Sequence, residues 1–196
     1  MTLPTTNFDA PFEITRASHV RVGCTDLEKS RDFYRDTIGL VVTEETDTAI
    51  YMRGLEEAAH HSLVLEWSPE AKAHRVGLRV LRDQDVLNAE RYFKAVGVEH
   101  ERVELDHQGP TLRFRDPVGT LMEITSEMSL VPRKMQDFDE FVAGAPQRLD
   151  HYQVVTYDVQ EATDFWTGLG MRMSEYTAKD GTDELWGSWM EVKGNT

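Results

Sequence analysis

The amino-acid sequence predicts an α+β protein made of tandem βαβββ modules, which form concave mixed sheets with helices outside. One observation is a repeated pattern, because Arg16 precedes His19 as Arg148 precedes His151, and a Phe follows each His by fourteen residues. Self-similarity of this kind indicates a duplicated structural unit. The second observation is the order of periodicities in each copy, in which a strand-like run is followed by a helical run and then by further strand-like runs.

The first module is the most clearly marked. Residues 18–24 alternate between apolar and polar side chains and predict a strand. The segment from Thr25 to Glu28 has the pattern of a capping box, and Gly39 follows the expected helix as a typical C-terminal residue. Strand-like runs then occupy 40–44, 48–53 and 62–67.

The second and third modules follow the same order. The second has its expected helix at 85–96, with strands at 74–80, 100–104, 111–115 and 120–126. The third starts with a strand at Leu149, and its helix begins after Asp158, with strands near 172–176 and 184–192. The sequence therefore predicts an N-terminal domain of two modules at 15–127, a connection at 128–147, and an incomplete first module of a second domain at 148–196.

Composition excludes several classes of partner. The formal net charge is -14, so nucleic acid and anionic membranes would repel the protein. No run of residues reaches the roughly 20 apolar residues that a membrane span needs. The single cysteine, Cys24, cannot form an internal disulfide and alternates with core positions. We expect a cytoplasmic protein that acts on a small molecule.

Several motifs together resemble the vicinal oxygen chelate superfamily. Within it, the greatest likeness is to two-domain extradiol ring-cleaving dioxygenases of the homoprotocatechuate and catechol 2,3-dioxygenase type. The segments that carry the resemblance are 25–34, 55–57, 60–65, 148–151 and the pair Trp189-Met190. The resemblance implies that the chain spans an N-terminal domain and the first half of a catalytic C-terminal domain.

The resemblance also implies a metal centre. In this family the C-terminal domain holds Fe(II), alternatively Mn(II), through two His and one Glu, and His151 matches the first His. On the expected strand, His151 and Gln153 would share one face. The other ligands and the acid-base catalyst are expected beyond Thr196, so the 196-residue chain alone is predicted to be inactive.

The first domain carries the matching positions in altered form. His19, Arg75 and Glu123 are expected to converge on the concave face as a degenerate site. A guanidinium stays charged and has no lone pair to give to a metal. We therefore expect no functional metal here and an ion pair between Arg75 and Glu123. His60 and His61, which precede a strand, are interpreted as solvent or subunit contacts.

Two further residues are candidates for substrate binding. Trp189 is expected on an open strand face, where its ring would contact a catechol, although core packing is an equal alternative. Gln153 is a candidate for orienting a bound oxygen, although the related enzymes carry Asn there.

The predicted function is extradiol, or meta, cleavage of a catechol-type aromatic such as homoprotocatechuate or catechol, with O2 as co-substrate, in aromatic catabolism. The alternatives are a metal-free small-molecule-binding module of the same fold and a glyoxalase-like metal isomerase. The resemblance implies a homo-oligomer, commonly a tetramer.

Overall fold

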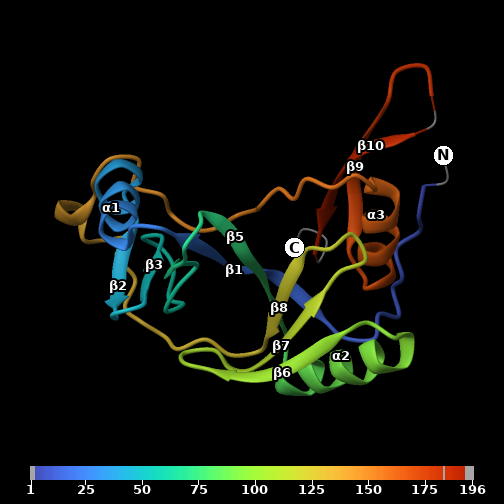
Figure 1. Ribbon diagram of the computed structural model, residues 1–196, viewed down its shortest axis with the longest axis horizontal. Coiled ribbons are helices and arrows are strands. Elements are labelled where there is room, and N and C mark those ends of the chain that lie inside the picture. The colour runs from blue at the N-terminus through green and yellow to red at the C-terminus, as the bar shows by residue number, and fades with distance from the viewer. Residues whose placement is uncertain (1–2, 183, 193–196) are drawn as a thin grey trace.

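The main body of the protein is one eight-stranded sheet that curls around a concave face (Figure 1). The computed structural model describes residues 3–182 and 184–192. The strand order is β2-β3-β4-β1-β5-β8-β7-β6. The strands are β1 (Ile14–Cys24), β2 (Val41–Glu45), β3 (Ala49–Arg53), β4 (Leu63–Trp67), β5 (Lys72–Val80), β6 (His100–Leu105), β7 (Gly109–Arg115) and β8 (Leu121–Thr125).

The pairing of the strands shows two modules joined side by side. Strand β1 runs parallel to β4 within the first module, and β5 runs parallel to β8 within the second. The modules meet where β1 pairs with β5 in the antiparallel sense. This arrangement confirms the α+β fold of βαβββ modules that the sequence predicts.

The helices lie outside the sheet. Helix α1 (Leu27–Asp32) starts where the Asp26 carboxylate accepts a hydrogen bond from the backbone of Lys29. Its last part is a π-helical segment, η1 (Phe33–Ile38), and not a continuous α-helix as expected. Gly39 ends it in the left-handed region, at φ 96°. The other helices are α2 (Asp83–Val96), η2 (Phe138–Glu140) and α3 (Val159–Gly168).

The third unit differs from the prediction at its beginning. Helix α3 and the hairpin of β9 (Arg172–Ala178) and β10 (Leu185–Glu191) form as expected, but the strand expected from Leu149 does not. A strand needs a neighbour that accepts its backbone hydrogen bonds, and among the described residues β9 pairs only with β10. The Leu149 backbone instead donates to the Glu57 carboxylate at 3.3 Å, so this segment lies against the loop between β3 and β4.

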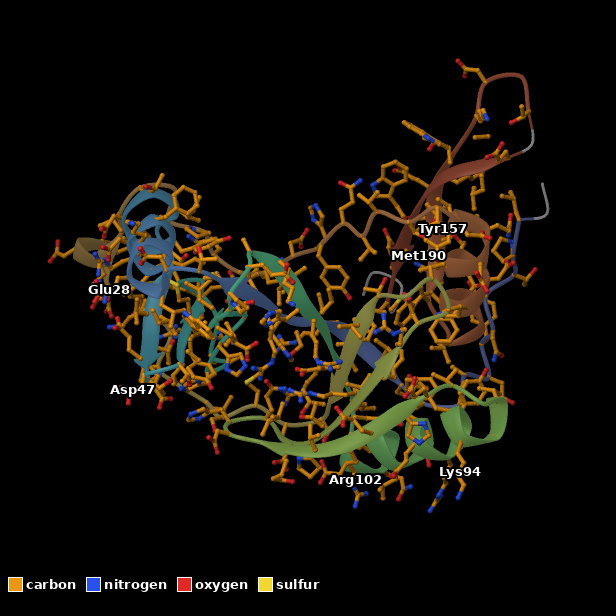
Figure 2. The ribbon with its side chains drawn as sticks, viewed as in Figure 1. Glu28, Asp47, Lys94, Arg102, Tyr157 and Met190 are labelled. Atoms are coloured by element: carbon orange, nitrogen blue, oxygen red, sulfur yellow. The ribbon has the colours of Figure 1, made fainter. Side chains whose placement is uncertain are left out.

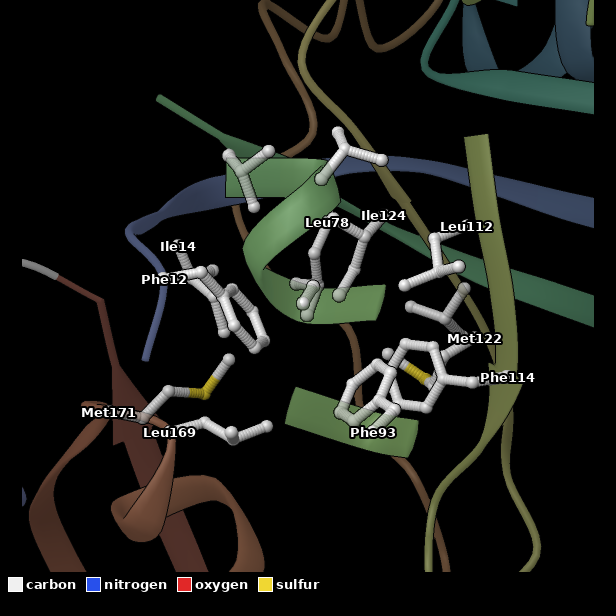
Figure 3. Close-up of a cluster of buried hydrophobic side chains, with 14 residues drawn as sticks. Phe12, Ile14, Leu78, Phe93, Leu112, Phe114, Met122, Ile124, Leu169 and Met171 are labelled. Carbon is white, nitrogen blue, oxygen red and sulfur yellow. The ribbon is translucent and has the colours of Figure 1, made fainter. Parts of the chain in front are cut away.

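The largest core cluster joins the third unit to the second module (Figure 3). Phe93 of α2 and Phe114 of β7 lie with ring centroids 4.5 Å apart. Phe12, which precedes β1, meets Phe93 edge to face at 5.8 Å. Leu169 and Met171, which follow α3, are buried in the same cluster. Each such side chain stabilises the fold by about 1.5–3 kcal/mol, so the third unit is packed firmly against the sheet domain.

Charged side chains occupy part of the outer surface of the molecule. Lys94 of α2 and Arg102 of β6 are both exposed on this outer surface (Figure 2). Within the part of the chain that the structure describes, no helix is long and apolar enough to cross a membrane.

Candidate metal and ligand sites

A buried row of three residues crosses the centre of the concave sheet. His19 of β1 pairs with Gly77 of β5, and Gly77 pairs with Glu123 of β8. A Cβ at Gly77 would overlap the His19 ring, so the glycine leaves the space through which His19 reaches across β5. His19 Nε2 donates to Glu123 Oε2 at 2.8 Å, and both side chains are fully buried.

Three arginines surround the Glu123 carboxylate. Arg21 Nε donates to one carboxylate oxygen at 3.0 Å and Arg113 Nε to the other at 2.9 Å. Arg75 Nε lies 3.8 Å away, so the expected Arg75 ion pair is the longest of the three contacts. Burial alone would raise the pKa of Glu123, but the hydrogen bond from His19 and the charges of Arg21 and Arg113 hold that pKa far below its usual value.

The residues around Glu123 do not fit a metal ion. Burial lowers the pKa of His19 more than the neighbouring carboxylate raises it, so the imidazole is neutral. Its Nε2–H group donates a hydrogen bond to Glu123. The remaining lone pair, on Nδ1, faces the Ser18 hydroxyl at 3.1 Å. The guanidinium groups offer no lone pair. A buried ion network therefore occupies the position at which the sequence predicts a degenerate site.

An open cavity lies beside this network. It has a volume of about 440 Å³, and its lining includes Arg21, Tyr51, Glu66, His74 and Arg113. Arg21 also donates to the Glu66 carboxylate at 2.7 Å, and His74 lies 2.8 Å from the same carboxylate. The wall thus combines an aromatic ring with both signs of charge, as a small polar ligand requires.

A second group of potential metal ligands was missed by the sequence analysis. Glu44 of β2, His60 before β4 and His107 of the β6–β7 turn bring two imidazole nitrogens and one carboxylate oxygen within 4.8 Å of one another. His60 and His61 are both buried, so their interpretation as solvent or subunit contacts is wrong. The adjacent histidines were visible in the sequence, but the approach of Glu44 and His107 depends on tertiary structure.

The predicted residues of the third unit lie apart from these two groups. His151 is in an irregular segment, and its side chain is 85% exposed. Its Nδ1 lies 3.1 Å from the Asp150 carboxylate. Trp189 lies on β10 with 53% of its surface exposed, and Gln153 is also exposed. In segments 3–182 and 184–192, no hydrogen bond or ring contact joins His151 to either residue.

The protein family that this chain matches includes proteins of several functions. Residues 16–124 match the Glyoxalase/Bleomycin resistance protein/Dioxygenase superfamily, which is more than half of the chain. The chain belongs to this superfamily. The curved sheet of paired βαβββ modules is the fold expected of a member.

Two curated relatives are enzymes named for the oxidation of dihydroxylated aromatic rings. The manganese-dependent 2,3-dihydroxybiphenyl 1,2-dioxygenase of Geobacillus genomosp. 3 is 29% identical over 192 residues, which cover 92% of this chain and 61% of the relative. The metapyrocatechase of Geobacillus stearothermophilus is 27% identical, with 95% of this chain and 60% of the relative covered.

A solved structure shows similarity over the same part of the chain, including the third unit. The homoprotocatechuate 2,3-dioxygenase of Brevibacterium fuscum, in complex with 3,4-dihydroxyphenylacetate, superposes with a TM-score of 0.89 at 35% identity. The alignment covers 98% of this chain and 61% of that chain. This chain therefore spans about three fifths of the length of these relatives.

Proposed function

We propose that the protein carrying this chain is an extradiol dioxygenase that opens the ring of a catechol-type aromatic. The observation that carries the proposal is the similarity over nearly the whole chain, third unit included, to enzymes named as dioxygenases of dihydroxylated aromatic rings. A relative named manganese-dependent supports Mn(II) as well as Fe(II) as the metal. A homo-oligomer remains part of the proposal.

His151 has the chemistry of one metal ligand. Asp150 lies where it accepts the Nδ1 proton of His151, which leaves the Nε2 lone pair free for a cation. A carboxylate behind a ligating imidazole fixes its tautomer and raises its basicity. One imidazole binds a divalent ion only weakly, so we propose that His151 acts together with a second His and a carboxylate. The bound metal would hold the catechol and O2 in adjacent positions for ring cleavage next to the paired hydroxyls.

Trp189 and Gln153 are proposed to contact the substrate. Trp189 offers an exposed indole on the β9–β10 hairpin, where it is paired with Glu175. A catechol ring can stack against such a face. Gln153 lies two residues after His151 and carries an exposed amide that can donate to a substrate oxygen. Their proposed roles are to orient the ring and its oxygens beside His151.

A metal-free binding module is the second candidate, because the cavity beside Arg21 is present in the described sheet domain. A glyoxalase-like isomerase would need metal ligands near Glu123. Arg21, Arg75 and Arg113 are found there, which weakens this alternative.

Ring cleavage by the full-length protein tests the proposal. The protein is loaded anaerobically with Fe(II) or Mn(II) and then mixed with 3,4-dihydroxyphenylacetate or catechol, while O2 uptake and the semialdehyde product are measured. We expect His151→Ala to lower turnover at least ~100-fold, because the metal loses a ligand. His100→Gln serves as the matched control, because His100 lies on β6 and is not a proposed metal ligand. Full turnover by the His151 variant would contradict the proposal.

A further inference from the structure

We propose that Glu44, His60 and His107 form a binding site for one divalent first-row transition-metal ion. Glu44 Oε2 lies 2.7 Å from His107 Nε2 and 3.2 Å from His60 Nε2. The three side chains come from β2, the β3–β4 loop and the β6–β7 turn, so the ion would connect three segments that are distant in sequence. Two imidazoles and one carboxylate are a donor set that zinc, iron and manganese accept.

A chain of hydrogen bonds leaves the His60 lone pair aimed at Glu44. Arg21 Nη2 donates to Gln108 Oε1 at 2.6 Å, which identifies that atom as the amide oxygen. His61 Nε2 lies 3.1 Å from the same oxygen and must therefore donate to it. His61 is fully buried, which favours the neutral ring, and with its proton on Nε2 the Nδ1 atom can only accept.

His60 is the next residue in this chain of hydrogen bonds. His60 Nδ1 lies 3.2 Å from His61 Nδ1, so His60 must carry the proton of this contact. A neutral His60 then presents a bare lone pair on Nε2 to the Glu44 carboxylate oxygen. Two electron-rich atoms at 3.2 Å repel each other unless a positive charge lies between them.

Local backbone irregularities bring the three groups together. The pairing of β2 with β3 shifts register between Val42 and Glu44, which is a bulge that re-aims the Glu44 side chain. His107 has φ 64°, in the left-handed region that a non-glycine residue rarely adopts. Ser129 connects the two loops, because its backbone accepts from His60 at 2.8 Å and donates to His107 at 2.7 Å. Strain of this kind is held by the surrounding structure and gathers at functional sites.

Ion binding requires one movement that the site permits. The His60 and His107 rings are parallel, with centroids 3.6 Å apart and planes 5° apart, so their lone pairs do not meet at one point. The His107 side chain is 28% exposed while that of His60 is 7% exposed, so His107 has more space in which to turn. Rotation of the His107 ring would bring both Nε2 atoms to one ion, and His60 would stay fixed by its bond to His61.

Titration of the metal-stripped full-length protein with Zn2+ tests the proposal by calorimetry. We expect Glu44→Gln and His107→Ala each to bind one equivalent less than the unaltered protein, or to bind it at least ~10-fold more weakly. Glu45→Gln is the matched control on the same strand, since Glu45 contacts Arg31 instead. His151→Ala must retain this equivalent, so a failure of the proposed ring-cleavage site is distinguished from a failure here.

Imidazole 15N spectra of the unaltered protein provide a second measurement that does not depend on the folding of a variant. Zn2+ is expected to shift Nε2 of His60 and His107 while Nδ1 of His60 stays protonated. Equal binding by the unaltered protein and both variants, or unchanged Nε2 signals at saturating Zn2+, would overturn the proposal. In that case the contact holds a proton and Glu44 pairs with a histidinium.

Discussion

At the scale of single residues, Glu123 is the centre of a buried ion network. A carboxylate with no exposed surface needs compensating charge, and Arg21 and Arg113 provide it at 3.0 and 2.9 Å. Removal of Glu123 would leave the buried Arg21 with Glu66 as its remaining carboxylate partner and Arg113 without this contact. The network is therefore expected to contribute to the stability of the fold.

The change Glu123→Gln tests this account. We expect the free energy of unfolding to fall by about 3 kcal/mol in urea titrations, because the buried arginine charge loses a carboxylate partner. The matched control is Glu90→Gln, because Glu90 forms only an exposed pair with Arg102. That change is expected to alter stability by less than about 0.5 kcal/mol. Equal effects of the two changes would contradict a buried network.

The buried histidines predict a dependence of stability on pH. The pKa values of His19 and His61 are both lowered from 6.5 by burial, so the unfolded chain binds more protons than the folded one below this pH. Stability must then decrease as pH falls through 6.5. Glu123 adds to the loss below 4.5, because its folded pKa is also lowered. Urea midpoints should decrease steadily from about pH 7.5 to about pH 5, and a flat profile would be inconsistent with neutral buried histidines.

At the scale of elements, the sequence predicted the modules better than their irregularities. Alternating apolar residues and capping patterns gave the strands and helices of both modules. The π-helical end of the first helix, the bulge before Glu44 and the left-handed His107 depend on tertiary contacts and leave no local pattern. The prediction of a strand at His151 was wrong for a related reason. Alternating apolar and polar residues indicate that a segment can form a strand, but the strand forms only where a partner strand is present.

A substitution at Gly77 of β5 tests whether this glycine leaves the space that the His19 ring occupies. Gly77→Ala would push a methyl group into the His19 ring, and we expect a loss of at least about 2 kcal/mol in the free energy of unfolding. Gly168→Ala is the control, since nothing lies within 4 Å of the added methyl and a helical alanine is favoured by up to about 1 kcal/mol over glycine. Thermal unfolding followed by circular dichroism compares the two variants. Tolerance of alanine at Gly77 would mean that His19 does not cross the sheet there.

At the scale of the whole molecule, the segment before β1 fastens the third unit to the sheet domain. Asn7 donates to the backbone oxygens of Thr167 and Gly168, and Thr6 donates to that of Met171. Phe12 then enters the core cluster beside Leu169. The segment that carries His151 therefore belongs to a unit that is anchored at its helix, although His151 itself is exposed.

The change Phe12→Ala should release this anchor. We expect a loss of about 3–5 kcal/mol in stability and faster amide hydrogen exchange in α3 and β9 than in β2–β4. Phe8→Ala is the matched control, because Phe8 is 85% exposed. If exchange in α3 is unchanged by the Phe12 variant, the third unit is held by other contacts.

The sequence could predict a site at the sheet centre but not its chemistry. Equivalent positions in the repeat identified His19, Arg75 and Glu123 as neighbours, and the structure brings His19 and Glu123 into contact. The dominant roles of Arg21 and Arg113 could not be foreseen, because they depend on which side chains of β1 and β7 turn inward. The role of His151 stays a prediction from resemblance.

Anomalous diffraction from crystals of the full-length protein grown with Mn(II) is the most direct test of the central claim, which is that His151 binds the catalytic metal. The account predicts a strong manganese peak bonded to His151 Nε2 and no peak between His19 and Glu123. A peak at His19 and Glu123, with His151 free of metal, would contradict it.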